Sequence, residues 1–242
     1  MSGHSKWANI KHRKEKTDSQ KGKIFTKLGR EILLAAKQGG ADPEVNTKLK
    51  DVIAKAKANN MPNDSIARSL KKASGDFDLQ NYEEIEYEGY GPGGVAVIVE
   101  CTTDNRNRTA GEVRHLFDKY GGNLGTSGCV AFLFEKKGQL IIEKTEKTME
   151  DDLMLEAIEA GADDFVAEEE YFEISTRVEV FSKVREALEE KGYEFATAEI
   201  TRVPSTWTKL EESKQLEFMQ KLIDNLEDLD DIGAVHHNWE ED

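Results

Sequence analysis

The first thirty residues combine many cations with flat aromatic rings. Residues 3–30 contain nine Lys or Arg residues against two acidic ones. Cations neutralise phosphates and release counterions, while Trp and His rings stack on unpaired bases. The pattern therefore predicts a contact surface for nucleic acid. Its candidate residues are His4, Ser5, Lys6, Trp7, Lys11, His12, Arg13, Lys14, Lys16, Lys21, Lys23, Lys27 and Arg30.

Two further arginines, Arg106 and Arg108, lie where a predicted strand runs into a predicted helix. A helix N-terminus with guanidinium groups favours phosphate. The alternative is that Asp104 and Asn107 shape the turn while the arginines pair with nearby acids. Both interpretations remain open, and Arg106 and Arg108 join the candidate nucleic-acid-binding set.

The glycine-rich segments 89–95 and 121–128 do not carry the GxxxxGK[ST] pattern of a phosphate loop. We expect a hairpin turn and a helix cap there. The histidines lack metal-ligand spacing, and no Ser/His/Asp or Cys/His set is tied together locally. The acidic clusters 168–170 and 228–231 are typical of solvated charge. The sequence therefore predicts no catalytic, metal or cofactor site. An enzyme that holds a phosphorylated ligand at these glycines is kept as the second of two alternative functions.

The charge is divided sharply along the chain. Residues 1–75 carry 17 cations against 7 acids, a net +10, whereas the remainder carries 16 against 41, a net −25; together they give −15. A polyanion would attract the first part and repel the second. We therefore expect the protein to dock on nucleic acid with one end only.

Composition sets the compartment that we expect. Cys101 and Cys129 sit in apolar runs and lack metal spacing, which favours buried thiols in a reducing compartment. No stretch approaches twenty apolar residues, and the basic N-terminus lacks the apolar core of a secretory signal. These features predict a cytoplasmic protein without a membrane partner.

Hydrophobic periodicity predicts the elements that position these residues. Residues 1–23 have few large apolar side chains and are expected to form a flexible arm. Residues 24–76 show helical spacing and predict a small helical domain. Residues 82–135 follow as ββαβ, with a Thr109–Glu112 capping box before the helix and a strand at 130–134.

Residues 138–204 show the order βαββαβ, which is typical of a ferredoxin-like unit. The remaining helix and strand cannot form a domain alone, so they should return to the earlier sheet. The predicted fold class is α+β: a small N-terminal helical domain, then two α/β domains, with the ferredoxin-like unit 138–204 inserted in a discontinuous domain made of 82–135 plus 206–242.

Several motifs together resemble the YebC/PmpR family over essentially the whole chain: GHSKWANIKHRK, GKIFTKLGREI, YEGYGPGG, DNRNRT, EVRH, GGNLG and the PST at Pro204. The family includes probable bacterial transcriptional regulators and the mitochondrial translational activator of cytochrome oxidase subunit one. The resemblance implies a three-domain fold and binding of nucleic acid, either as DNA in transcription or on the ribosome, where stalls at proline-rich stretches are relieved.

Between these two targets, the residues favour RNA. Sequence-specific DNA reading generally uses a folded helix or ribbon in the major groove, and no clear reader stands out in the sequence. A flexible Lys-rich arm with one Trp suits the unpaired bases of irregular RNA. We therefore expect a non-enzymatic, ribosome-associated translation factor that binds rRNA or tRNA, with a DNA-binding transcriptional regulator as the alternative.

Overall fold

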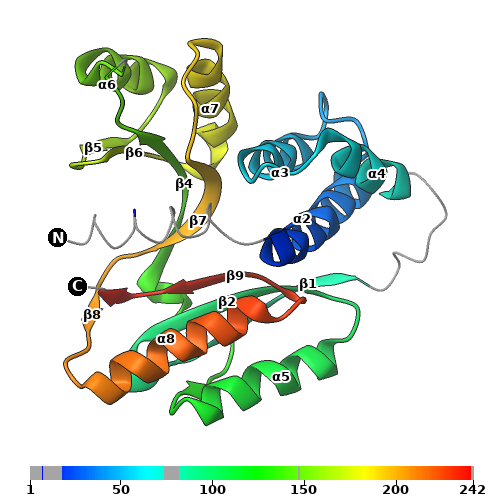
Figure 1. Cartoon of the computed structure of the whole chain (residues 1–242), viewed down its shortest axis with the longest axis vertical. Coiled ribbons are helices and arrows are strands. Elements are labelled where there is room, and N and C mark those ends of the chain that lie inside the picture. Colours follow the sequence, from blue (N-terminus) through cyan, green and yellow to red (C-terminus); the bar gives the residue numbers. More distant parts are fainter. Residues whose placement is uncertain (1–6, 8–17, 74–81, 147, 241–242) are drawn as a thin grey trace.

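The chain forms a helical region and two sheet-containing regions (Figure 1). The computed structural model describes residue 7 and residues 18–73, 82–146 and 148–240. The helical region comprises α2 (Asp18–Gly39), α3 (Thr47–Ala58) and α4 (Asn63–Ala73). The helix predicted to begin at residue 24 therefore begins at Asp18, so part of the segment expected to be a flexible arm is helical.

A small apolar core joins the three helices. Leu28, Ile32, Leu49 and Ile66 are buried in it. Asn46 caps α3 by accepting a hydrogen bond from the Leu49 amide, and its side-chain amide donates to carbonyl oxygens at the end of α2. A buried polar side chain that satisfies both helix ends fixes the loop between them. The helical region is therefore a folded support for the cations on its surface.

The first sheet has the order β3-β1-β2-β9, with every neighbouring pair antiparallel. Its strands are β1 (Glu83–Tyr90), β2 (Ala96–Thr103), β3 (Asn123–Leu124) and β9 (Ile232–His237). The helices α5 (Arg106–Lys119) and α8 (Ser213–Asp228) cover one face of this sheet, as Figure 1 shows. The C-terminal strand therefore returns to a sheet that begins about 150 residues earlier in the chain.

Two local predictions in this region are wrong. Helix α5 begins at Arg106 and is capped by Asn105, whose side chain accepts from the Arg108 amide, so Thr109 is inside the helix and forms no capping box. Residues 131–133 form a short 3-10 helix in place of the strand expected at 130–134. The strand that follows this 3-10 helix begins where it pairs with a strand much later in the chain. The local pattern does not encode this pairing, which sets the boundary between the 3-10 helix and the strand.

The second sheet has the order β5-β6-β4-β7 and is antiparallel throughout. It contains β4 (Phe134–Glu143), β5 (Asp164–Ala167), β6 (Tyr171–Thr176) and β7 (Thr197–Pro204), with α6 (Glu150–Ala160) and α7 (Phe181–Glu190) on one face. In chain order this is the ferredoxin-like arrangement. The short strands β8 (Thr208–Lys209) and β10 (Trp239–Glu240) pair in parallel as a separate two-stranded sheet. The predicted α+β fold class is confirmed.

Charged contacts hold α3 against the ferredoxin-like unit. Lys55 pairs with Glu31 of α2 at 3.1 Å and lies 3.7 Å from Glu199 of β7. Asp51 accepts hydrogen bonds from Ser182 at 2.7–2.8 Å and contacts the buried Arg185 guanidinium at 3.5 Å. Buried ions need such partners to offset the loss of water. Part of the positive charge counted in the sequence is therefore used inside the protein.

Within the described parts of the chain, no helix is long and apolar enough to cross a membrane.

Candidate nucleic-acid interface

One side of α2 is docked on the C-terminal end of α8. The Lys23 ammonium lies 2.5 Å from the Asp228 carboxylate, and Lys27 donates to the Glu227 carbonyl oxygen at 2.5 Å. Arg30 donates to the Asp230 carbonyl oxygen at 2.8 Å. The last carbonyls of a helix lack partners within the helix and carry partial negative charge, so cations stabilise them. These three candidate residues therefore face protein in this structure.

The buried carboxylate of Asp231 is the centre of this junction. It accepts hydrogen bonds from Arg108 at 2.6 Å, Thr109 at 2.9 Å and Thr103 at 3.0 Å, and it pairs with Arg30 at 3.1 Å. Burial acts to raise the pKa of Asp231, but the hydrogen bonds from Arg108, Thr109 and Thr103 outweigh it, so this pKa lies below its ordinary value.

The sequence interpretation of residues 228–231 as solvated charge is therefore wrong for Asp231. The carboxylate has a side-chain exposure of only 7% and joins α2, the β2–α5 junction and the start of β9. Its partner Arg30 is about 200 positions away in the chain. The local sequence does not distinguish Asp231 from its exposed neighbours, except that Asp231 stands directly before an apolar strand.

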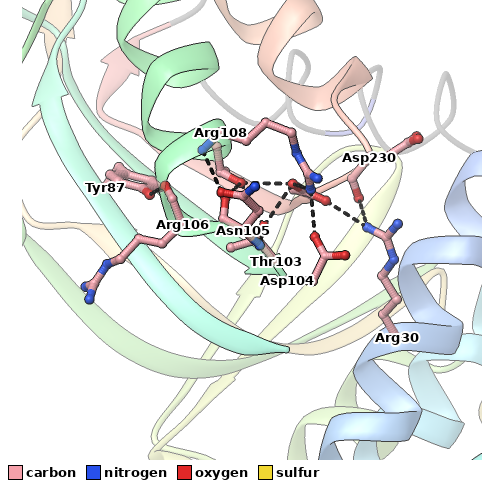
Figure 2. Close-up of polar contacts among 10 residues, drawn as sticks. Arg30, Tyr87, Thr103, Asp104, Asn105, Arg106, Arg108 and Asp230 are labelled. Atoms are coloured by element: carbon pink, nitrogen blue, oxygen red, sulfur yellow. Dashed lines mark hydrogen bonds and ion pairs between the residues drawn. The ribbon is translucent and has the colours of Figure 1, made fainter. Parts of the chain in front are cut away.

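The two arginines of the β2–α5 junction have different environments. Arg108 is held by Asp231 and by Asp104 at 2.9 Å, the second being the local pairing considered from the sequence. The Arg106 side chain points away from this cluster in Figure 2 and is exposed, while its carbonyl oxygen accepts from the Tyr87 hydroxyl at 3.1 Å. Arg106 is therefore better placed than Arg108 for contact with an external anion.

A second side of α2 forms a groove with α4, and Arg30 contributes to both sides. This groove has a volume of about 440 Å³, and no acidic residue lines it. Its lining residues are Phe25, Thr26, Gly29, Arg30, Leu33, Leu34, Lys37, Met61, Ser65, Arg68, Ser69, Lys72 and Tyr82. Apolar side chains and cations thus occur together in one concavity, which we call the α2–α4 groove.

The groove cations Arg68 and Lys72 are exposed. The Arg68 guanidinium donates to the Ser65 hydroxyl at 2.9 Å and to the Asp64 carbonyl oxygen at 3.2 Å, both in its own helix. Arg30 lies 5.6 Å from the centre of the Tyr82 ring. A guanidinium oriented by neutral groups keeps its full charge for an anion. Arg68 and Lys72 were not among the candidates predicted from the sequence, although both belong to the basic part of the chain, residues 1–75.

Trp7 is placed differently from the sequence expectation. Its side chain is 3% exposed, and its ring stacks on Tyr171 of β6 with a centroid distance of 5.3 Å. Ile141 and Ala196 complete this apolar cluster on the ferredoxin-like unit. In this conformation the Trp7 ring packs on protein and is not open to stacking on a base.

The other arm candidates are only partly covered by the structure. Lys21 is partly buried in the first turn of α2. The following candidates lie outside the described residues: His4, Ser5, Lys6, Lys11, His12, Arg13, Lys14 and Lys16.

The two glycine-rich loops pack closely on each other. A Cβ on Gly122 would lie 2.6 Å from the Tyr90 carbonyl oxygen, and one on Gly89 would lie 2.6 Å from the Asn123 carbonyl oxygen. The Glu88 carboxylate accepts hydrogen bonds at 2.6–2.9 Å from the backbone amide of Gly128, at the end of the second segment, and from those of Val130 and Ala131 just after it. A carboxylate of the protein itself therefore occupies the anion position at this end of the segment.

Glu88 is a structural residue that the sequence interpretation missed. Burial acts to raise the pKa of Glu88, but the three backbone hydrogen bonds bring it below its ordinary value. Among the described residues, no group of His, Cys, Asp or Glu is arranged to hold a metal ion.

Taken together, the geometry defines a class of protein: a multidomain α+β protein with one basic helical face and two acidic sheet-containing regions. Residues 5–76 match the family described as "TACO1/YebC protein N-terminal domain", and residues 82–239 match "TACO1/YebC second and third domain". The chain belongs to the TACO1/YebC family.

Its relatives match over their full length. A protein of Acetivibrio thermocellus is 71% identical, with 99% of each chain covered, and one of Ruminiclostridium cellulolyticum is 64% identical, with 100% of this chain and 98% of the relative covered. Both are named probable transcriptional regulatory proteins. The crystal structure of a conserved hypothetical protein from Aquifex aeolicus is similar, with a TM-score of 0.82, 45% identity and coverage of 93% and 92%.

Proposed function

We propose that this protein is a non-enzymatic, cytoplasmic regulator of gene expression that binds nucleic acid through its helical region. The observation that supports this proposal is the α2–α4 groove, where cations and apolar side chains share one concavity without an acidic residue. Phosphates supply the anions and bases supply the flat apolar surfaces that such a lining complements. Arg106 and the arm cations extend the contact.

The acidic domains orient the protein on the nucleic acid. The chain after residue 75 has a net charge of −25, so it is repelled by a polyphosphate while the helical region is attracted. The nucleic acid therefore meets one end of the molecule. The two sheet-containing domains remain available for other contacts.

The first candidate target is DNA in transcription. The most informative support is the name shared by the two bacterial relatives described above, probable transcriptional regulatory protein. In this function the groove cations contact the duplex backbone, and contacts to phosphates alone position a protein without reading sequence.

A second candidate target is rRNA or tRNA on the ribosome, where the protein would relieve stalls at proline-rich stretches. The apolar residues that line the groove, which include Phe25, Leu33 and Met61, favour this target because a flat base can enter only when it is unpaired. A regular duplex exposes phosphates and groove edges but keeps its bases stacked.

Equilibrium binding by the full chain separates these targets. A labelled DNA duplex, the same duplex as RNA, and an RNA hairpin with an unpaired loop are titrated over a range of salt concentrations. Preference for a promoter duplex over the hairpin supports the transcriptional function, and preference for the hairpin together with co-sedimentation with ribosomes supports the translational one. For either target, the logarithm of affinity should fall with the logarithm of salt by about 0.7–0.9 per phosphate contacted.

Charge reversal tests whether the groove is the contact. We expect the double variant Arg68→Glu, Lys72→Glu to bind at least about tenfold more weakly and to reduce the salt slope by about 2. Lys183→Glu is the matched control, because Lys183 is an exposed cation on α7 of the acidic ferredoxin-like unit. Equal losses in both variants, or no loss in either, would contradict the proposal.

A further inference from the structure

Helix α6 has an apolar side that the fold leaves uncovered. Its inner residues Leu153, Ala157 and Ala160 are buried in the core of the ferredoxin-like unit. Its other large apolar residues point outward: Met154 is 40% exposed, Leu155 57% and Ile158 55%. We call these three residues the α6 outer face.

The three residues form one surface. Met154 and Ile158 are four positions apart, and Leu155 and Ile158 are three apart, so their side chains are neighbours on the helix. Single exposed apolar residues are ordinary, but adjacent ones within a polar surround are typical of a contact site. Methionine also adapts its shape readily to a partner.

Acidic residues surround the α6 outer face. Helix α6 contains five acidic residues and no cation. Glu150 and Glu156 are paired with Lys144 and Lys191, whereas Asp151, Asp152 and Glu159 are exposed at the edge of the apolar surface. The whole unit 138–204 has 19 acidic residues against 7 cations, a net charge of −12.

This rim determines which occupants fit. A nucleic acid would bring phosphates against carboxylates, and a second copy using the same face would bring carboxylates against carboxylates. A protein whose contact surface is apolar and ringed by Lys or Arg is complementary to the α6 outer face in both hydrophobicity and charge.

From this combination we infer that the α6 outer face docks a partner protein whose contact surface is apolar and ringed by basic residues. One exposed helix face is small for a permanent interface and fits a transient contact. In Figure 1, α6 lies in a different part of the molecule from α4, so the partner and the nucleic acid can be bound together.

Site-specific crosslinking in cells tests this inference. A photoreactive residue is placed at Leu155 of the full chain, and the matched control is placed at Val45, an exposed apolar residue of the helical region. We expect a crosslink from position 155, and not from position 45, to a peptide in which apolar residues adjoin Lys or Arg.

The partner identified in this way is then purified and titrated. We expect Ile158→Glu, and separately the double variant Asp152→Lys, Glu159→Lys, each to weaken its binding about tenfold, which corresponds to about 1.4 kcal/mol. Nucleic-acid affinity of the Ile158→Glu variant should stay unchanged, so this inference and the proposed function can fail separately.

Four outcomes would overturn the inference. They are crosslinks from position 155 to nucleic acid, crosslinks to a second copy of the chain, no product above the Val45 control, and a purified partner whose affinity neither variant changes.

Discussion

Cations lie on two sides of α2, where one set faces α8 and the other lines the α2–α4 groove, and the two sets have different partners. On the side of α8, Lys23, Lys27 and Arg30 are bound to carbonyl oxygens and carboxylates of residues 227–231. On the side of α4, Arg68 and Lys72 line a concavity without acids. The first set stabilises a junction between domains, and the second remains available to an external anion. A count of cations therefore overstates the surface that can bind nucleic acid.

The largest effect on stability is expected at the buried carboxylate of the junction. Asp231→Ala should lower the free energy of unfolding by about 3 kcal/mol, because Arg108, Thr103 and Thr109 lose their shared acceptor. Urea denaturation measures this change. Asp230→Ala is the control: its side chain is exposed, so it should cost less than about 0.5 kcal/mol. Similar losses in both variants would remove the distinction between buried and exposed acids.

Single arginine variants test the comparison between junction and groove directly. Arg108→Ala should lower the free energy of unfolding and leave nucleic-acid affinity nearly unchanged, because Arg108 is held by Asp231 and Asp104. Arg68→Ala should have the reverse effect, with affinity reduced several-fold at low salt and stability altered by less than about 0.5 kcal/mol. Each variant is measured by urea denaturation and by titration with nucleic acid. If Arg108→Ala reduced affinity and Arg68→Ala reduced stability, Arg108 would be the residue that binds nucleic acid and Arg68 the one that stabilises the fold.

Acid should weaken the carboxylate contacts that hold the domains together. Although burial acts to raise the pKa of Glu100, contacts with His236 and Arg202 lower it from 4.5 to about 2. A pKa lowered by folding stabilises the protein above the unfolded value, and this stabilisation is lost as pH falls toward the folded value. Unfolding free energy should therefore decrease between about pH 4.5 and pH 2, with about 1–2 kcal/mol from Glu100 after allowance for its partial exposure.

The matched variant Glu100→Gln identifies the contribution of this group. It should be less stable than the parent at neutral pH and should lose less stability on acidification, as measured by urea denaturation at several pH values. Parallel pH profiles for the two proteins would show that Glu100 does not contribute.

The smallest effect is expected where a junction cation is only weakly held. The Lys23–Asp228 pair is exposed to solvent, which screens its attraction, so the pair contributes little to stability. Asp228→Asn should therefore change stability little, and it should raise nucleic-acid affinity about two-fold by removing a competing negative charge. Lower affinity in this variant would show that Asp228 assists binding.

Some predictions from the sequence were correct and others were wrong, for physical reasons. The order of most helices and strands and the ferredoxin-like arrangement follow from hydrophobic spacing along short segments. The return of the C-terminal strand follows because the last helix and strand cannot form a domain alone. The helix cap at Asn105 was missed because Thr109 and Glu112 have the spacing of a capping box inside a helix that had already begun. Local spacing identifies an element more reliably than it identifies the residue at which the element begins.

Trp7 shows the limit of composition as evidence for a binding residue. A tryptophan among lysines is typical of a surface that stacks on bases, and the same ring also packs well in an apolar cluster. Here Ile141, Tyr171 and Ala196 form such a cluster with it on the ferredoxin-like unit. The choice between these environments depends on residues more than 130 positions away in the chain.

The sequence by itself determined the fold class, the separation of a basic N-terminal part from an acidic remainder, and the family resemblance, because each depends on residue type and local order. Only the tertiary structure decided which charges are enclosed and which face solvent. Asp231 and its exposed neighbour Asp230 are chemically identical, and they differ because folding brings Arg30 and Arg108 to one of them and removes water from it. Electrostatic interactions depend on distance in space and on solvent access, and neither is encoded by position along the chain.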